Sequence, residues 1–185
     1  MLVFLDFEAS SLGKQSYPIE VAWVFEDGRS EAHLIRPAPG WADWDVRSEA
    51  IHRISRETLL GEGTPHEAVA QRMLEQLGGH DLFASAPSWD GKWLSTLLRA
   101  ASLPRHSLRL RDTDVALLAA AKAILDPVLD GGGLSAAIEV ALRAADLYAS
   151  GEPPAHRALA DAREEWARWQ AVRRAAEALA LSARA

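Results

Sequence analysis

The order of patterns along the chain predicts an α/β fold, in which a mixed five-stranded sheet is flanked by helices. Three strand-like segments come first, and two further strands then alternate with helical segments. This order is typical of sheets that combine antiparallel and parallel neighbours. A chain of 185 residues is within the range of one ordinary domain, so we expect residues 1–185 to form a single domain.

The three leading strands lie in the first forty residues. Residues 1–5, MLVFL, are all apolar, which is typical of a buried strand. In YPIEVAWVFEDG, residues 17–28, apolar side chains alternate, and the Asp-Gly pair predicts a hairpin into SEAHLIRP, residues 30–37. Residues 37–63 form a long segment with a short helical pattern near its end. Segments of that length in compact domains are usually functional or partly helical.

The rest of the chain alternates helices with two strands. Residues 64–79 predict a helix, because they combine a Thr cap, Pro in the first turn and a Gly stop. We expect a strand within residues 81–88, a helix at 90–101, and a strand at 107–116 that runs into a helix at 115–125. After a DGGG loop come a helix at 134–146 and a long amphipathic helix from about residue 156 to 181.

Composition excludes several classes of site. The chain has no cysteine, so a disulfide, a thiolate nucleophile or a sulfur-ligated zinc is impossible, and any metal must be held by oxygen or imidazole. A net charge of −6 argues against a broad nucleic-acid-binding surface, although a local site with metal ions could still bind phosphate. The first apolar run lacks a preceding basic region and soon ends in acids, so we expect no membrane segment and a cytoplasmic location.

Two carboxylates stand at the end of the first strand, in the sequence DFE. Side chains alternate across a strand, so Asp6 and Glu8 should point to one side and Phe7 to the other. At a separation of about 6 Å and an effective dielectric of about 20, two such charges repel by roughly 3 kcal/mol. A divalent cation such as magnesium would offset that repulsion. The alternative is that the acids simply meet solvent at a strand end.

A second group of polar residues lies in PPAHRALADA, residues 153–162. His156 and Asp161 are five positions apart, which is about 140° on a regular helix, so they could not share a site if both were helical. Pro153 and Pro154 disfavour helix just before the histidine, so His156 can lie on the entry loop with Asp161 inside the helix. The alternative is an ordinary helix start followed by a solvated acid.

A third candidate is Asp90 in SAPSWDGKWL, residues 85–94, where a predicted strand gives way to a helix. An aspartate at a helix start is also a routine cap, which is the plainer interpretation. Trp89 and Trp93 are four residues apart and are expected to pack the helix rather than to contact a ligand.

Taken together, these pieces resemble the three motifs of the DEDDh 3′-to-5′ exonucleases, which include polymerase proofreading subunits, ribonuclease T and oligoribonuclease. The resemblance covers residues 1 to about 170 and implies a ribonuclease H-like fold. It also implies two divalent metal ions, Mg²⁺ or Mn²⁺, nucleic acid 3′ ends as the partner, and a homodimer as in several relatives. The residues that the resemblance assigns are the metal ligands Asp6, Glu8, Asp90 and Asp161, the catalytic base His156, and the substrate contacts Ala9, Ser10, Leu12 and His52.

The sequence departs from the family pattern at three places. The first motif is commonly followed by Thr-Thr-Gly and an apolar residue, which here is the stretch of residues 9–12, ASSL. Arg53 replaces a glycine after His52, in a segment that relatives usually write His-Gly-Ile-Thr. Ala86 stands where an Asn often precedes the middle acid, which makes Asp90 the least supported of the assignments.

The function implied by this resemblance is a metal-dependent 3′-5′ exonuclease that releases nucleoside 5′-monophosphates from single-stranded DNA or RNA. Two alternatives stay open. One is a hydrolase of dinucleotides or small phosphodiesters, which suits the acidic charge of the chain. The other is a non-catalytic nucleic-acid-binding module of the same fold. The choice between DNA and RNA depends on pocket geometry that no motif here determines.

Overall fold

The fold is built on a six-stranded mixed sheet. The computed structural model describes residues 1–149 and 156–184. The strand order is β4-β3-β2-β1-β5-β6; β2 is antiparallel to β1 and β3, and the remaining neighbours are parallel. The strands are β1 (Leu2–Ala9), β2 (Pro18–Phe25), β3 (Ser30–Arg36), β4 (Thr64–Pro65), β5 (Asp81–Ala84) and β6 (Leu110–Asp112).

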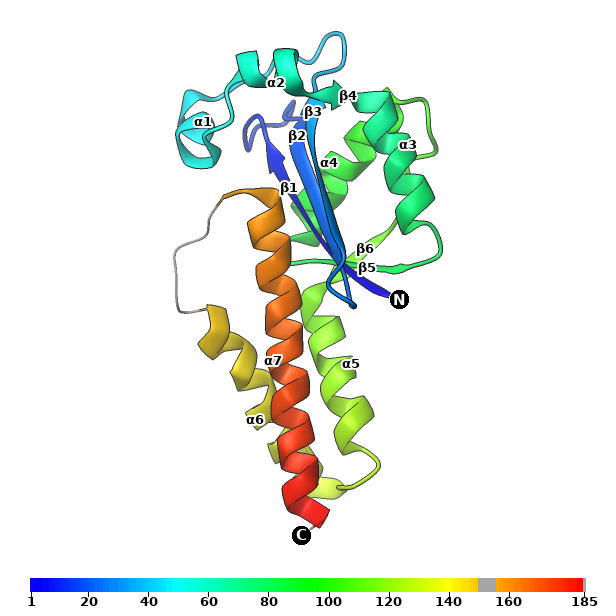
Figure 1. Ribbon diagram of the computed structural model, residues 1–185, viewed down its shortest axis with the longest axis vertical. Helices are drawn as coiled ribbons and strands as arrows, with labels where there is room; N and C mark the ends of the chain where they lie inside the picture. The colour runs from blue at the N-terminus through cyan, green and yellow to red at the C-terminus, as the bar shows by residue number, and fades with distance from the viewer. Residues whose placement is uncertain (150–155, 185) are drawn as a thin grey trace.

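Seven helices in the described residues surround this sheet (Figure 1). Two short helices lie in the long segment after β3, α3 and α4 pack on one face of the sheet, and α5, α6 and α7 extend together beyond it. Each helix of the described residues is too short or too polar to cross a membrane. The helices are α1 (Val46–His52), α2 (Arg56–Glu62), α3 (His66–Leu77), α4 (Pro87–Ala100), α5 (Thr113–Leu125), α6 (Gly131–Ala149) and α7 (Ala158–Arg184).

The central strand β1 is covered on both faces, as its apolar run predicts. Val3, Leu5 and Phe7 pack in one core cluster with α3 and α4. Phe4 points to the opposite face, where its ring lies 5.7 Å from that of Trp169 on α7. Because side chains alternate along a strand, the carboxylates that follow Phe4 on the same face are directed towards α7.

The predicted α/β architecture is confirmed, with two differences in detail. All five expected strands are present, and a sixth, β4, is added at the edge because the backbone of Thr64 pairs with Ile35 of β3. Thr64 therefore does not cap α3, which begins at His66 without a side-chain cap. Helix α6 begins at Gly131, inside the glycine run that we expected to be a loop.

Candidate metal centre

Three carboxylates converge where β1 ends beside the first turn of α7. Three carboxylate oxygens, one each from Asp6, Glu8 and Asp161, lie within 4.8 Å of one another. Asp6 and Glu8 come from alternate positions of β1, and Asp161 is the fourth residue of α7. The structure thus brings together residues that are more than 150 positions apart in the sequence.

The charges in this group disfavour one another's ionised forms. Burial raises the pKa of Asp6 well above its ordinary value, and the nearby charges of Asp90, Glu8 and Asp161 raise it further. Burial, followed by the charges of Asp161 and Glu20, raises the pKa of Glu8 to about 8. Such shifts are expected where carboxylates share a site without a counter-ion. The oxygen-only donor set therefore fits a hard divalent cation.

Asp90 lies close to the group of three without belonging to it. It is 2% exposed and sits in the first turn of α4, whose N-cap is Ala86, so it is not the helix cap. Burial raises its pKa to about 7. Its Oδ2 atom is buried and has no hydrogen-bond partner within the described part of the chain. An inward-facing, unpartnered carboxylate oxygen beside three others is consistent with a cation-binding role.

His156 lies just outside α7, as the five-residue spacing predicts. Helix α7 starts two residues later, at Ala158, so the 140° separation of a regular helix does not apply to His156 and Asp161. The backbone of His156 is left-handed, with a φ of 49°. Together with Glu8, it lines a pocket of about 240 Å³. Pro153 and Pro154 lie outside the described residues.

The same pocket contains several of the predicted substrate contacts. Ala9, Leu12 and His52 line it, whereas the Ser10 hydroxyl is buried and bonded to Asp43 and to the Tyr17 N–H. His52 is 2% exposed, and its Nδ1 accepts a hydrogen bond from the N–H of Ile54. The proton of the neutral ring is thereby placed on Nε2, which has no partner among residues 1–149 and 156–184.

Leu12 separates this pocket from a second, more open one of about 380 Å³. Leu12 is 68% exposed and lines both pockets. Trp89 also lines the open pocket, with the Lys92 ammonium 5.1 Å from the centre of its ring. Trp93 packs in the core as expected, and the Trp89 ring packs against it, with the ring centres 5.6 Å apart, while its other side is exposed at this pocket.

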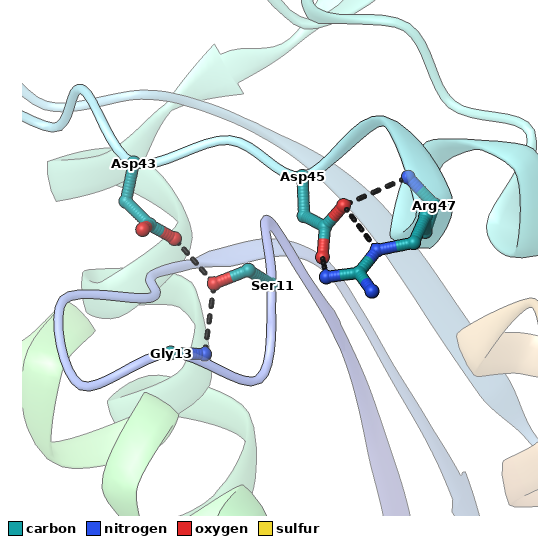
Figure 2. A network of polar contacts seen from close by, with 5 residues as sticks. All are labelled: Ser11, Gly13, Asp43, Asp45 and Arg47. Atoms are coloured by element: carbon teal, nitrogen blue, oxygen red, sulfur yellow. Dashed lines mark hydrogen bonds and ion pairs between the residues drawn. The ribbon is translucent and has the colours of Figure 1, made fainter.

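The loop that carries Leu12, where the sequence departs from the Thr-Thr-Gly pattern, is held by polar contacts. The Ser11 hydroxyl donates to Asp43 Oδ2 at 2.5 Å and accepts from the N–H of Gly13 at 2.9 Å (Figure 2). On the same segment, Asp45 caps α1 and pairs with Arg47. The segment that leads into α1 is therefore tied to the loop after β1, and both reach the pocket that contains His52.

Solved structures identify the fold that this arrangement belongs to. Exonuclease I from Methylocaldum szegediense superposes with a TM-score of 0.64 and 19% identity, over 91% of this chain and 39% of that chain. The chain has the fold of exonuclease I. The zinc-bound complex of Escherichia coli exonuclease I with single-stranded DNA gives 0.62 at 17% identity, over 90% of this chain and 38% of that chain. A complex with a dA16 oligonucleotide gives the same TM-score.

The match covers only part of exonuclease I, because this chain spans less than two-fifths of its length. No protein-family model matches the sequence, and no curated protein matches it significantly. The exonuclease I fold is ribonuclease H-like, so the fold expected from the three motifs is confirmed over about 90% of the chain.

Two further acids beside the carboxylate cluster were not predicted. Glu165 is one helical turn after Asp161, 9% exposed and paired with Arg168 at 2.9 Å, and its charge raises the pKa of both Asp6 and Asp90. Its spacing of four from Asp161 could have identified it. Glu20 is buried on β2, opposite Glu8, and its ion-pair partner is 137 residues away in the sequence. No local sequence pattern could therefore predict that Glu20 lies beside this site.

Proposed function

We propose that this protein is a metal-dependent 3′-5′ exonuclease that releases nucleoside 5′-monophosphates from single-stranded DNA or RNA. The observation that carries the proposal is the cluster of Asp6, Glu8 and Asp161 beside a pocket lined by Glu8 and His156. An exonuclease I fold under this cluster supports it, since those structures include complexes with single-stranded DNA.

The carboxylates would hold the metal ions. Asp6, Glu8 and Asp161 offer one group of oxygens. Asp90, whose charge acts on Asp6 and whose Oδ2 has no partner among the described residues, would help to hold a second ion. Two Mg²⁺ or Mn²⁺ ions held there would supply the positive charge that activates an attacking water and neutralises a leaving 3′ oxygen. The raised pKa values of Asp6, Glu8 and Asp90 mean that protons compete with the ions for these oxygens.

His156 would accept the proton of the attacking water. Imidazole suits this role because its ordinary pKa, about 6.5, is close to neutral pH. The residue is exposed at the pocket and begins no helix, so its ring can approach a bound substrate. Glu8 lines the same pocket, which places the proposed base beside a proposed metal ligand.

The pocket would receive the 3′-terminal nucleotide. Ala9 and Leu12 offer apolar contacts, and the Nε2–H of His52 can donate to an oxygen of the sugar or base. Burial lowers the pKa of His52, so the ring stays neutral and recognises the nucleotide as a donor and not as a charge. Leu12, exposed between the two pockets, would contact the terminal base on one side.

A direct assay tests the function. The protein is incubated with Mg²⁺ and 5′-labelled DNA and RNA oligonucleotides of matched sequence, in lengths from two nucleotides upwards. An exonuclease of this polarity yields a ladder that shortens from the 3′ end and stops in chelator. Cleavage of dinucleotides alone would instead support the small-phosphodiester hydrolase, and binding without cleavage would support the non-catalytic module.

A further inference from the structure

Glu20 is a buried carboxylate beside the proposed active site that is assigned no part in metal binding. It lies on β2, is 4% exposed, and stands opposite Glu8 in the β1–β2 pairing. A carboxylate so deeply buried is kept only where hydrogen bonds and an opposite charge satisfy it. The partners of Glu20 therefore show which segment of the chain is anchored to β2.

Among the described residues, the hydrogen bonds to the Glu20 carboxylate come from the start of α7 and the residue before it. Arg157 donates to it through Nη2 at 2.7 Å and through Nε at 3.1 Å, and the backbone N–H of Ala158 donates at 3.0 Å. The two-pronged guanidinium bond fixes orientation as well as distance. The bond from Ala158 satisfies one of the N–H groups that a helix leaves free in its first turn.

Arg157 joins the two functional residues on either side of it. His156 immediately precedes it with a left-handed backbone, which L-residues adopt rarely. The carbonyl of Arg157 accepts from the N–H of Ala160 at 2.8 Å and of Asp161 at 3.1 Å, so it also begins the helix that carries Asp161. Anchoring Arg157 to β2 therefore restrains the proposed base and a proposed metal ligand relative to β1.

We propose that Glu20 and Arg157 form a positioning pair that holds His156 over the active-site pocket. This inference rests on the proposed exonuclease function. Neither residue belongs to the group of three carboxylates or to the pocket lining; the pair acts through the backbone that links Arg157 to His156. Its carboxylate is supplied by the strand next to the one that bears Asp6 and Glu8, so Arg157 is anchored to the same sheet as those two proposed ligands.

The test compares Arg157→Ala and Arg157→Lys with a matched control, Arg163→Ala. Arg163 is an exposed arginine of the same helix, outside the proposed site. Misplacing a catalytic group by a small distance can cost about 100-fold in rate, so Arg157→Ala should lower kcat by up to about that factor with little change in KM. Arg157→Lys, which keeps one charge but loses the two-pronged bond, should fall between. Arg163→Ala should match wild type.

A double-mutant cycle separates positioning from general destabilisation. If Arg157 acts through His156, replacing it in a His156→Ala background should add almost no further loss of rate, because coupled residues are not additive. Two losses that multiply would overturn the proposal, and so would an unchanged kcat in Arg157→Ala. Circular dichroism establishes whether each variant is folded. If Arg157→Ala is not folded, Glu20→Gln takes its place in the same comparison.

An amide-exchange measurement keeps this inference distinguishable from the function itself. Hydrogen exchange at Ala158 should be faster in Arg157→Ala than in wild type or Arg163→Ala, because Glu20 loses the ion pair that directs it at that N–H. Unchanged exchange overturns the pair whatever the activity. If wild type cleaves neither DNA nor RNA, the exonuclease proposal fails, and with it the role of the pair in catalysis, even where exchange shows the pair to be present.

Discussion

Asp6 owes its place in the site to the two-residue period of β1. It follows Phe4 on the face towards α7, where it is half-buried among like charges. Asp6→Asn removes one of these charges with little change in shape. We expect loss of nearly all nuclease activity, because a ligand charge is missing, together with a higher melting temperature of the metal-free protein, because repulsion is relieved.

The measurements for Asp6→Asn are a nuclease rate in Mg²⁺ and thermal unfolding in chelator. Asp27→Asn is the matched control, since Asp27 is an exposed acid in the turn after β2 that pairs with Arg29. It should leave the nuclease rate unchanged. A fully active Asp6→Asn protein, or wild-type rates in excess chelator, would rule out the proposed metal site.

His156 gives the sharpest prediction for a single residue. His156→Ala should lower the rate by about two to four orders of magnitude, the usual contribution of a positioned base. Metal binding should be nearly intact, because Asp6, Glu8 and Asp161 remain. A His156→Ala variant that keeps most of the wild-type rate would remove His156 from the mechanism.

For single residues, the sequence pattern predicted those positions that depend only on the local geometry of a strand or a helix. Alternation placed Asp6 and Glu8 on one face, and the spacing of His156 from Asp161 placed the histidine outside the helix. The role of Glu20 was not predictable, because its partner is brought to it only by the packing of α7 against β2. The roles proposed for the site residues remain predictions.

Strands and helices with a clear repeat of apolar residues were predicted well. Elements that form only by pairing with a segment distant in the sequence were not. The strands β1 to β3 and the helix α7 follow from apolar runs and spacing. The edge strand β4 is two residues long and exists because β3 offers a free edge beside Thr64. A strand of two residues is too short for a sequence pattern to predict. The same pairing explains why Thr64 does not cap α3 as predicted.

The loop after β1 is the element that should set preference for single-stranded ends. It presents Leu12 at 68% exposure between two pockets, and contacts with a terminal base are worth on the order of 1 to 3 kcal/mol. Leu12→Ala should therefore weaken binding of 3′-terminal nucleotides by roughly tenfold or more. Wild type should cut single strands faster than blunt duplexes, and the variant should lose part of that difference.

Rates and apparent Kd values on matched single-stranded and duplex substrates measure this effect. Leu181→Ala is the control, because Leu181 is about equally exposed but lies near the end of α7. Equal wild-type rates on the two substrates, with no effect of Leu12→Ala, would show that Leu12 is an ordinary loop residue.

The tie between Ser11 and Asp43 should keep that loop in place. Ser11→Ala removes the hydroxyl that bridges Asp43 and the N–H of Gly13. Loss of such a bond costs about 1 kcal/mol, so thermal stability should fall slightly. The preference for single strands should shift in the same direction as in Leu12→Ala. Unchanged preference, measured on the same pair of substrates, would separate the tie from substrate selection.

For the whole molecule, the acidic centre makes stability depend on pH and on metal together. The pKa of Glu8 rises from 4.5 to about 8 on folding, so the folded state binds this proton more tightly than the unfolded state. The free energy of unfolding therefore falls as pH rises through that window. Asp90, raised to about 7, contributes with the same sign. His52, whose pKa is lowered by burial, contributes with the opposite sign.

Comparing Glu8→Gln with wild type isolates the carboxylate from these other groups. In chelator, the variant should gain stability over wild type as pH rises from about 5 to about 8, because only wild type acquires a charge at this half-buried position. With Mn²⁺ present, the gain should shrink or reverse, since a cation that binds only the folded state stabilises the ionised site. Thermal unfolding at several pH values, with and without Mn²⁺, measures both effects. A difference between the two proteins that is independent of pH and of metal would show that Glu8 neither carries a raised pKa nor binds an ion.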